Sequence, residues 1–305
     1  GQYLRDHGGL YDVVTLCRHY IAIQHVDLLR EHHPDTQIWF DTIDLHYLRL
    51  RRQHELDQSP ATLKMAEMAY HEECEVISKS DLTIVVSEVE VTELANEAPD
   101  AKVAVISNIH EVARDRPAFD DRRGVMFVGG FQHPPNIDAV EYYANEIWPL
   151  LTERCPDLET YVIGSRMPDR LKRLGESRGL KMLGFVEDLT PYYESCALAI
   201  APLRYGAGVK GKVNQALSFG LPVVGSAVAF EGMGLTHERE VMVAETAEDF
   251  AESVAKVCAD RALWLTLSER GGASLAGRFT PEVAEAALRD VLAPWLDERD
   301  LKTVG

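Results

Sequence analysis

The stretch that decides the fold is Ala201–Phe230, which reads APLRYGAGVKGKVNQALSFGLPVVGSAVAF. A buried strand is expected to end at Pro202 and a helix to begin near Lys210, with a glycine-rich loop between them. Gly206 and Gly208 in that loop let the backbone come close to a ligand. The first N–H groups of the helix would then point at the ligand, with the positive end of the helix dipole behind them.

Three cations, Arg204, Lys210 and Lys212, fall within nine residues of this loop, in a chain whose formal net charge is −18. The helix turns apolar directly after them, so we expect the cations at the mouth of a site and not along a solvated face. The pattern predicts a cradle for a diphosphate. The simpler alternative is a tight strand-to-helix connection whose charged side chains are merely solvated.

Two other phosphate-binding motifs match the loop in part. Residues 206–211 read GxGxxG, and Glu231 follows twenty residues later, as in a dinucleotide fold. That fingerprint belongs to the first βα unit of its domain, whereas this loop follows the fourth expected strand. Residues 206–212 read GxxxxGK, but Val213 stands where a P-loop needs Ser or Thr to bind magnesium. Both motifs therefore rank below the diphosphate cradle.

The composition excludes several classes of protein. A chain of 305 residues is long enough for two domains. Its 49 acidic residues against 31 Lys and Arg disfavour nucleic acid as a partner, because phosphate backbones require clustered basic charge. No apolar run approaches the roughly 20 residues that span a bilayer. The five cysteines form no CxxC motif, no export signal is visible, and the chain opens on Gly1 and not on Met. We therefore expect a fragment or processed chain from a reducing compartment.

Strand-length apolar runs alternate with helical patterns from end to end, which predicts an α/β fold with parallel sheets covered by helices. We expect a partial N-terminal domain at 1–112, a linker at 113–123, a C-terminal domain at 124–280 and a closing helix at 281–305. The N-terminal domain has four expected strands against six, so it is expected to be truncated. The expected strands are Tyr11–Cys17, Gln37–Thr42, Leu82–Ser87, Val103–Ile106, Val125–Val128, Glu159–Ile163, Lys181–Leu183, Leu198–Pro202, Pro222–Gly225 and Glu240–Ala244.

Three motifs resemble, in the right order, the donor-binding domain of glycosyltransferase family 4, whose enzymes have the GT-B fold of two Rossmann-like doubly wound domains. The loop and helix at 202–224 resemble PLRxGxGxKxKxxEAxxxGxPVV. Residues 129–140, GGFQHPPNIDAV, resemble GGFxHxPNxDAV, and residues 184–189, GFVEDL, resemble GxVxDL. The resemblance covers roughly residues 122–296. It is weaker in the N-terminal part, where it rests on Phe40–Arg49 and Lys79–Ser87.

The resemblance implies transfer of a sugar from a UDP-, GDP- or dTDP-linked donor, with retention at the anomeric carbon and without a metal or another cofactor. It also implies a role for each matching residue. The donor diphosphate would be bound by Gly129, Gly130, Arg204, Gly208, Lys210 and Lys212, the nucleoside by Phe185, Val186 and Gln215, and the donor sugar by Glu231 and Gly232. Gln215 departs from the family, which usually has a glutamate there; its amide forms hydrogen bonds without the strengthening charge. For Glu231 and Gly232 an ordinary acidic loop is an equally good interpretation.

Asp44 and His46 follow an expected strand of the N-terminal part, and clefts form at the carboxyl ends of such strands. We expect one of them to face the acceptor or the transferred sugar, as the catalytic candidates. The alternative is a helix-capping Asp44 and an interfacial histidine. Nine of the eleven histidines precede Glu111, which raises the hypothesis of a zinc site, but no HxxxH or HxH pair occurs and the hypothesis is disfavoured.

The family resemblance further implies a glycan or lipid-linked acceptor and a role in bacterial surface polysaccharide biosynthesis. The expected location is the cytoplasm, at the inner face of the membrane, where peripheral membrane contact can occur. A rival hypothesis is a GT-B domain that binds a nucleotide or glycan without catalysis, inside a larger protein. A hydride-transfer function requires that a nicotinamide cofactor binds.

Overall fold

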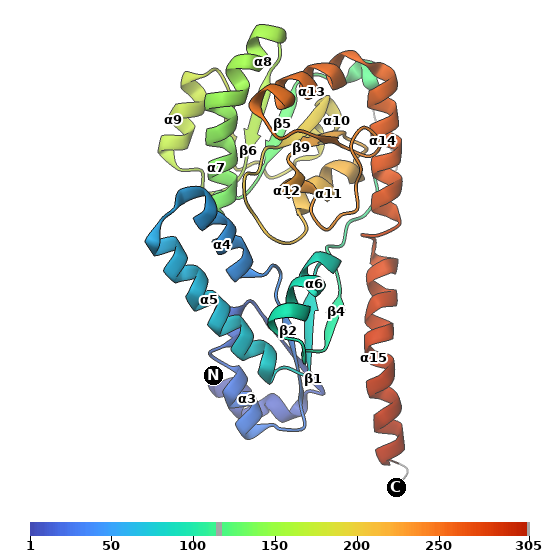
Figure 1. Cartoon of the computed structure of the whole chain (residues 1–305). Coiled ribbons are helices and arrows are strands. Elements are labelled where there is room, and N and C mark those ends of the chain that lie inside the picture. The colour runs from blue at the N-terminus through green and yellow to red at the C-terminus, as the bar shows by residue number, and fades with distance from the viewer. Residues whose placement is uncertain (114–117, 304–305) are drawn as a thin grey trace. The chain divides into compact units, whose positions relative to one another are not determined.

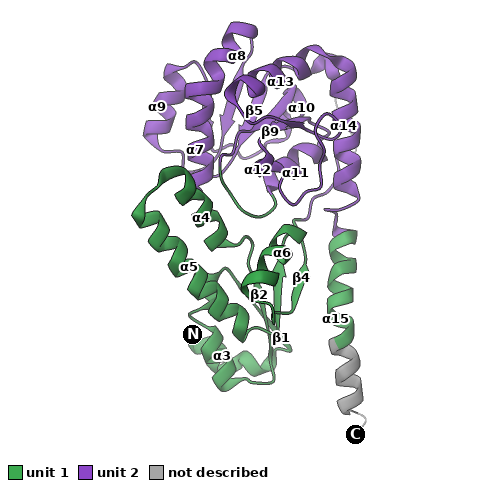
Figure 2. Cartoon of the chain, in the orientation of Figure 1, with its two compact units in different colours: residues 1–108, 205–209, 282–305 green, residues 109–204, 210–281 purple. Residues whose placement is uncertain are grey.

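The computed structural model describes residues 1–113 and 118–303, with the side chains of 295–303 excepted (Figure 1). Internal contacts divide the chain into an N-terminal unit, residues 1–108, 205–209 and 282–305, and a C-terminal unit, residues 109–204 and 210–281 (Figure 2). The expected linker at 113–123 lies partly outside the described residues. Its described part includes a 3₁₀ turn, Phe119–Asp121. The five cysteines are free thiols.

The N-terminal unit is built on a four-stranded parallel sheet with the order β1-β2-β3-β4. Its core gathers apolar residues of β2 and of the helices around it, among them Phe40, Leu29 and Val76. The strands are β1 (Val13–Cys17), β2 (Gln37–Asp41), β3 (Leu82–Val85) and β4 (Val103–Val105). The helices are α1 (Gln2–His7), α2 (His19–Ala22), α3 (Val26–His32), α4 (His46–Asp57), α5 (Pro60–Lys79) and α6 (Glu88–Glu97), with α15 (Pro281–Thr303) at the end of the chain.

The C-terminal unit is built on a six-stranded parallel sheet with the order β10-β9-β8-β5-β6-β7. The strands are β5 (Val125–Val128), β6 (Thr160–Ile163), β7 (Lys181–Gly184), β8 (Leu198–Ala201), β9 (Val223–Gly225) and β10 (Met242–Val243). The helices are α7 (Pro134–Tyr142), α8 (Trp148–Arg154), α9 (Asp169–Ser177), α10 (Thr190–Ser195), α11 (Gly211–Ser218), α12 (Ala227–Phe230), α13 (Ala247–Ala259) and α14 (Arg261–Ala276). Winding reverses between β5 and β8, and in such sheets ligands bind beside the carboxyl ends of the strands at the reversal.

All ten strands predicted from the sequence are present. The helices differ more. The apolar pattern of residues 137–154 predicts one continuous helix there, but a π-helical turn, Tyr143–Ile147, interrupts it just before Pro149. Proline has no N–H to donate to the preceding turn, which accounts for the change of hydrogen-bond pattern there. No described helix is long and apolar enough to cross a bilayer.

Helix α4 begins without a cap from its own sequence. Its N-cap residue is Leu45, whose side chain has no acceptor. Asp44, the cap considered from the sequence, does not fill this role, because it precedes the N-cap and accepts a 2.8 Å hydrogen bond from Nε of Arg49. The capping interpretation of Asp44 is therefore wrong. The first amides of α4 must find their acceptors elsewhere.

Two buried glutamates from other helices supply these acceptors. Glu73 of α5 accepts from the backbone N–H groups of His46 and Tyr47 at 2.9 and 3.0 Å. Glu90 of α6 accepts from the N–H of Leu45 at 3.2 Å. The two glutamates are 0% and 1% exposed. The start of α4, where His46 lies, is thus positioned by α5 and α6, and we call the two glutamates the carboxylate clamp.

We predict that Glu90→Ala lowers the free energy of unfolding by about 3 kcal/mol, because it leaves buried N–H groups without an acceptor. Urea unfolding followed by circular dichroism measures the difference. Glu88→Ala is the matched control: this glutamate is exposed in the same helical turn, and its loss is expected to cost less than about 1 kcal/mol. Equal losses for the two variants would contradict the role of Glu90.

Candidate functional site

The reversal of strand order between β5 and β8 places the loops that follow these two strands next to each other. The loop after β5 carries Gly129 and Gly130 and leads into α7. The loop after β8 carries Arg204 and leads to α11, whose N-cap is Lys210. Strands β5 and β8 are neighbours in the sheet, so both loops leave it at adjacent carboxyl ends. No side-chain hydrogen bond caps α11 at Lys210. This is the geometry in which helix N-termini receive anions.

Lys212 has its ammonium group buried in this region. Its Nζ lies 4.2 Å from the centre of the Phe127 ring and donates a hydrogen bond to Oδ1 of Asn136. The amide nitrogen of Asn136 in turn donates to the carbonyl of Gly130 at 2.8 Å. Burial, with a smaller repulsion from Lys210, lowers the pKa of Lys212 to about 7. The residue as a whole is only half-buried, but its pKa depends on the surroundings of the ammonium, which lies deep.

Arg204 contacts α7, the helix that carries Asn136. It forms an ion pair with Asp138 of α7, in which Nε donates to Oδ2 at 3.0 Å, and its guanidinium lies 5.2 Å from the centre of the Tyr142 ring. Lys212 and Arg204 therefore both contact α7, through Asn136 and Asp138. An anion that binds Arg204 must compete with the carboxylate of Asp138.

The structure gives a steric reason for glycine at position 129. A Cβ at this position would lie 2.7 Å from Cγ of Asn136, so the glycine makes room for the amide that binds Lys212. Gly208 has φ of +67°, a conformation that L side chains rarely adopt. The two glycines thus meet steric requirements of the folded chain itself.

The nucleoside and sugar candidates lie on other loops of the C-terminal unit. Phe185 follows β7 with its side chain 72% exposed, and Val186 beside it is half-buried. Gln215 of α11 donates to Oγ of Ser218 at 3.3 Å and is also hydrogen-bonded to His110. The half-buried residues Glu231 and Gly232 follow α12, and Gly232 has φ of +73°.

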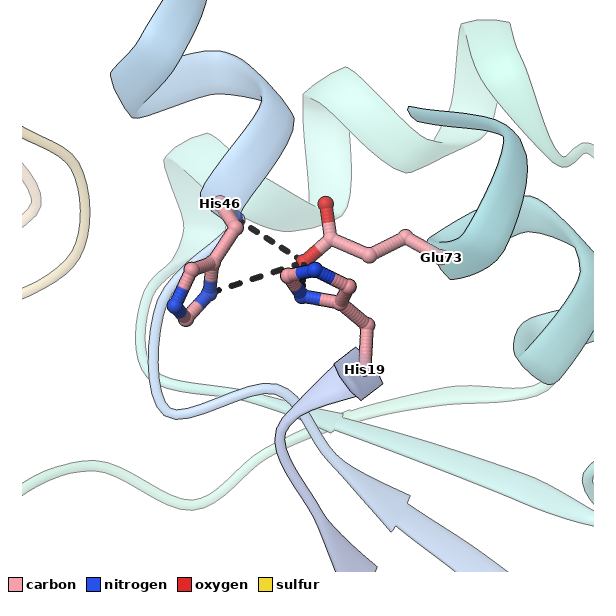
Figure 3. Close-up of side chains that lie close together, drawn as sticks. All are labelled: His19, His46 and Glu73. Atoms are coloured by element: carbon pink, nitrogen blue, oxygen red, sulfur yellow. Dashed lines mark hydrogen bonds and ion pairs between the residues drawn. The ribbon is translucent and has the colours of Figure 1, made fainter. Parts of the chain in front are cut away.

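In the N-terminal unit, His46 belongs to a buried cluster. The rings of His19 and His46 are 4.7 Å apart, edge to face. Both imidazoles lie near Glu73: its Oε1 is 3.6 Å from Nδ1 of His19 and 3.9 Å from Nδ1 of His46. The three side chains point toward one another from α2, α4 and α5 (Figure 3). Asp44 adjoins the cluster, with Oδ1 3.3 Å from Nδ1 of His46.

Burial governs the charge of this cluster. It lowers the pKa of His19 to about 4, aided by His46, and it lowers the pKa of His46 against the opposing effect of Asp44. Burial also raises the pKa of Glu73 to about 8, although two backbone N–H groups favour its charged form. The cluster is therefore biased toward uncharged side chains near pH 7.

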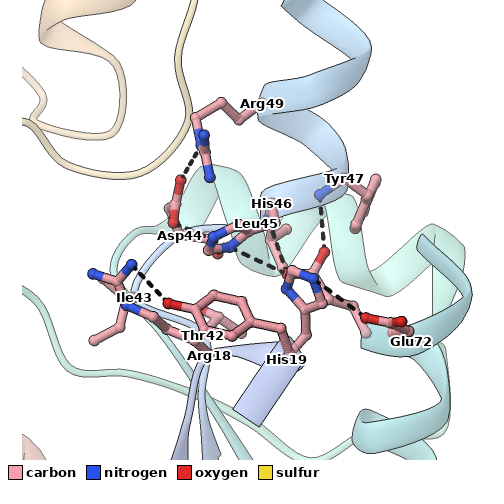
Figure 4. A network of polar contacts seen from close by, with 12 residues as sticks. Arg18, His19, Thr42, Ile43, Asp44, Leu45, His46, Tyr47, Arg49 and Glu72 are labelled. Carbon is pink, nitrogen blue, oxygen red and sulfur yellow. Dashed lines mark hydrogen bonds and ion pairs between the residues drawn. The ribbon is translucent and has the colours of Figure 1, made fainter. Parts of the chain in front are cut away.

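Two residues with strained backbones flank the cluster (Figure 4). Arg18 and Ile43 have φ of +68° and +64°, and they lie just after β1 and β2, which are neighbours in the sheet. Positive φ is costly for a β-branched residue such as Ile43. Strain of this kind concentrates at functional sites.

The sequence analysis found Asp44 and His46 but missed His19, Glu73 and Arg49. His19 and His46 are 27 positions apart, so a search for short histidine pairs could not connect them. One signal was available: both histidines closely follow expected strands, and the carboxyl ends of parallel neighbours meet at one edge. Glu73 stands among other glutamates in the sequence, a pattern that is typical of a solvated helical face, whereas it is fully buried.

Comparison with known proteins agrees with the resemblance that the sequence motifs show. Residues 122–260 match the family model described as "Glycosyl transferases group 1". A Klebsiella pneumoniae protein, described as an uncharacterized 44.6 kDa protein in the cps region, is 27% identical over 138 residues. That match covers 43% of this chain and 36% of the relative, so it spans little more than a third of the relative's length.

Solved structures resemble the whole chain. Sucrose-phosphate synthase from Thermosynechococcus elongatus has a TM-score of 0.77 at 18% identity, over 100% of this chain and 76% of that one. Anabaena Alr3699/HepE, in complex with UDP and glucose, has a TM-score of 0.73 at 14% identity, over 96% of this chain and 80% of that one. The protein therefore has the GT-B fold, with a region at 122–260 similar to group 1 glycosyl transferases.

Proposed function

We propose that the chain is the donor-binding and part of the acceptor-side portion of a retaining glycosyltransferase. It would transfer a sugar from a nucleotide-diphosphate donor to a glycan or lipid-linked acceptor, in bacterial surface polysaccharide biosynthesis at the cytoplasmic face of the membrane. The match to group 1 glycosyl transferases supports the reaction class. The relative from a cps region and the structure of HepE with UDP and glucose fit the setting and the donor.

The observation that carries the proposal is the group of cations beside α11. The ammonium of Lys212 is buried over Phe127, Arg204 contacts Asp138 of α7, and Lys210 is the N-cap of α11. As the glycosidic bond to the diphosphate breaks, negative charge grows on the leaving group. Preorganised cations and the helix N-terminus would stabilise that charge electrostatically. This arrangement assigns to the chain's own residues the role that a divalent metal has in other transferases, so we propose that donor binding is metal-independent.

The remaining donor contacts follow the same proposal. The exposed ring of Phe185 and the neighbouring Val186 would hold the base, Gln215 would face the ribose, and Glu231 with Gly232 would meet the sugar. On the acceptor side, Asp44 and His46 remain the catalytic candidates. Both lie at the strained carboxyl edge of β1 and β2, where a cleft is expected.

A second candidate function is a GT-B domain that binds a nucleotide without transferring a sugar. The observation that favours it is Gln215, which lacks the charge of a glutamate and is already hydrogen-bonded to Ser218 and His110. Donor turnover by the full-length protein distinguishes the two functions. Sugar transfer or donor hydrolysis excludes the binding-only function, whereas donor binding alone leaves it in place.

The first experiment is a thermal-shift screen against UDP, GDP, dTDP, ADP and NAD, with and without magnesium. Stabilisation by one nucleoside diphosphate, equal in the presence and absence of magnesium, would establish the donor site and identify the base. Stabilisation by NAD alone would replace glycosyl transfer with hydride transfer. The absence of any shift would contradict donor binding.

We predict that Arg204→Ala and Lys210→Ala each weaken binding of the diphosphate by about tenfold to 100-fold, because each removes a charged hydrogen bond or ion pair. Binding of the corresponding nucleoside, which has no phosphate, should change little. Calorimetric titration measures both ligands. Lys172→Ala, which removes an exposed lysine of α9, is the control and should leave both affinities unchanged. Equal losses for diphosphate and nucleoside would remove the cradle assignment.

We also predict that diphosphate binding takes up a proton at pH 8. The pKa of Lys212 in the empty site is about 7, so its amine is mostly neutral at pH 8, and a bound anion raises that pKa. Uptake should approach one proton per site at pH 8 and vanish near pH 6, where Lys212 is already charged. Titrations in two buffers of different ionisation enthalpy measure the uptake. The Lys212→Met variant should show none, and unchanged uptake in it would assign the proton to another group.

A further inference from the structure

The N-terminal unit contains a group of possible metal ligands that the proposed function does not require. His19, His46 and Glu73 come from α2, α4 and α5 and are 7%, 8% and 0% exposed. Each offers one ligand atom, and these atoms all lie within 4.8 Å of one another. Buried polar side chains are rarely brought this close without a reason, because each must be taken out of water. The closeness of these three side chains therefore needs a physical cause.

The separations are too long for direct hydrogen bonds. Oε1 of Glu73 is 3.6 Å from Nδ1 of His19 and 3.9 Å from Nδ1 of His46, whereas N–H···O bonds measure about 2.7–3.2 Å. Two ligands of one tetrahedral zinc ion, each about 2.0–2.1 Å from the metal, lie roughly 3.4 Å apart. The two separations from Oε1 of Glu73 are therefore closer to the separation of two ligand atoms on a common ion than to a hydrogen bond.

The hydrogen bonding of His19 supports this. Its Nδ1 is buried and has no hydrogen-bond partner among the described residues. Its other nitrogen, Nε2, lies 3.5 Å from a carboxylate oxygen of Glu72. This distance is longer than a hydrogen bond, so Glu72 lies near the ring without a direct hydrogen bond to it. Histidines that bind metals commonly have a carboxylate on the side of their second nitrogen. His19 is thus arranged with a carboxylate behind it and a bare nitrogen facing Glu73.

The hydrogen bonds of Glu73 leave room for a further ligand. Oε1 accepts from the N–H of His46, and Oε2 accepts from the N–H of Tyr47. A carboxylate oxygen has two lone pairs, so Oε1 can hold this bond and contact a cation as well. Arg18 and Ile43, which have positive φ, precede His19 by one residue and His46 by three residues.

We propose that His19, His46 and Glu73 bind one divalent transition-metal ion of the zinc type. Two imidazoles and one carboxylate are the ligand set of open zinc sites, in which water or a ligand takes the fourth position. The ion would link α2, α4 and α5 and would fix the position of His46 and the neighbouring Asp44. It is not the partner of the donor diphosphate, whose proposed cations all belong to other segments of the chain. The site can therefore exist whether or not the proposed transfer reaction takes place.

The test begins with the unmodified protein. The purified chain is stripped with a chelator, incubated with Zn²⁺, dialysed, and measured for metal content by mass spectrometry. We expect about one ion per chain and a higher melting temperature than in the stripped protein, because the metal binds the folded state. Replacement by Co²⁺ should give the visible absorption of a four- or five-coordinate nitrogen and oxygen site. Substoichiometric metal together with no cobalt absorption would overturn the proposal.

Variants then locate the ion. His19→Ala should lower zinc affinity more than about 100-fold and abolish the cobalt bands, since it removes a direct ligand. His71→Ala, an exposed histidine of α5, is the matched control and should bind as the wild type does. Wild-type affinity in His19→Ala would place the ion elsewhere and overturn the proposal. The circular dichroism spectrum of each stripped variant checks its folding, and Glu73→Gln, which retains an acceptor oxygen for α4, gives a second loss of affinity if His19→Ala does not fold.

UDP binding, measured on the same samples, separates this proposal from the proposed function. Loss of zinc in His19→Ala with unchanged UDP affinity supports the metal site as an independent feature. Zinc binding in a wild-type chain that binds no nucleotide would support the metal site and contradict the donor site.

Discussion

The C-terminal unit depends on the cost of burying an ammonium group. Lys212 lies over an aromatic ring and against a single amide oxygen, and its pKa is lowered accordingly. The surrounding residues follow from this placement: Asn136 must reach Nζ, Gly129 must have no side chain so that Asn136 fits, and the carbonyl of Gly130 must accept from the same amide. The first turn of the domain and the helix after β8 are thus joined by one polar chain of contacts. An anion placed there would meet a group whose charge is incompletely satisfied by the protein.

In the N-terminal unit, acidic side chains are removed from water in a comparable way. Carboxyl groups of Glu73 and Glu90 are buried, and backbone N–H groups at the start of α4 compensate for their removal from water. Arg49 is nearly buried as well and binds Asp44. Buried charged groups of this kind are costly unless each is paired or hydrogen-bonded. Their concentration at one edge of the sheet marks that edge as more than a packing surface.

The strands and the fold class could be predicted because they depend on local apolar runs and on alternation with helices. The reversal between β5 and β8 could not, although the glycine-rich loop was correctly placed after a buried strand. The candidate donor residues were found through motifs, but their contacts were not: nothing in the sequence shows that Arg204 binds Asp138 or that Gln215 bonds to His110. His46 and Glu73 lie 27 and 54 positions after His19 in the sequence. The glutamates around Glu73 form a pattern that is typical of a solvated helix. Long-range pairing of this kind is set by strand order, which a single sequence does not reveal.

The carboxylate clamp has a consequence for the order in which the N-terminal unit folds. Helix α4, HYLRLRRQHELD, is strongly polar and has no cap of its own, so an isolated segment of this sequence has little to hold it in a helix. The N–H groups of Leu45, His46 and Tyr47 donate to glutamates of α5 and α6, elements that follow α4 in the chain. The segment that carries Asp44 and His46 must therefore wait for later elements to dock. During synthesis, this edge of the sheet can therefore take its final form only after α5 and α6 have been made.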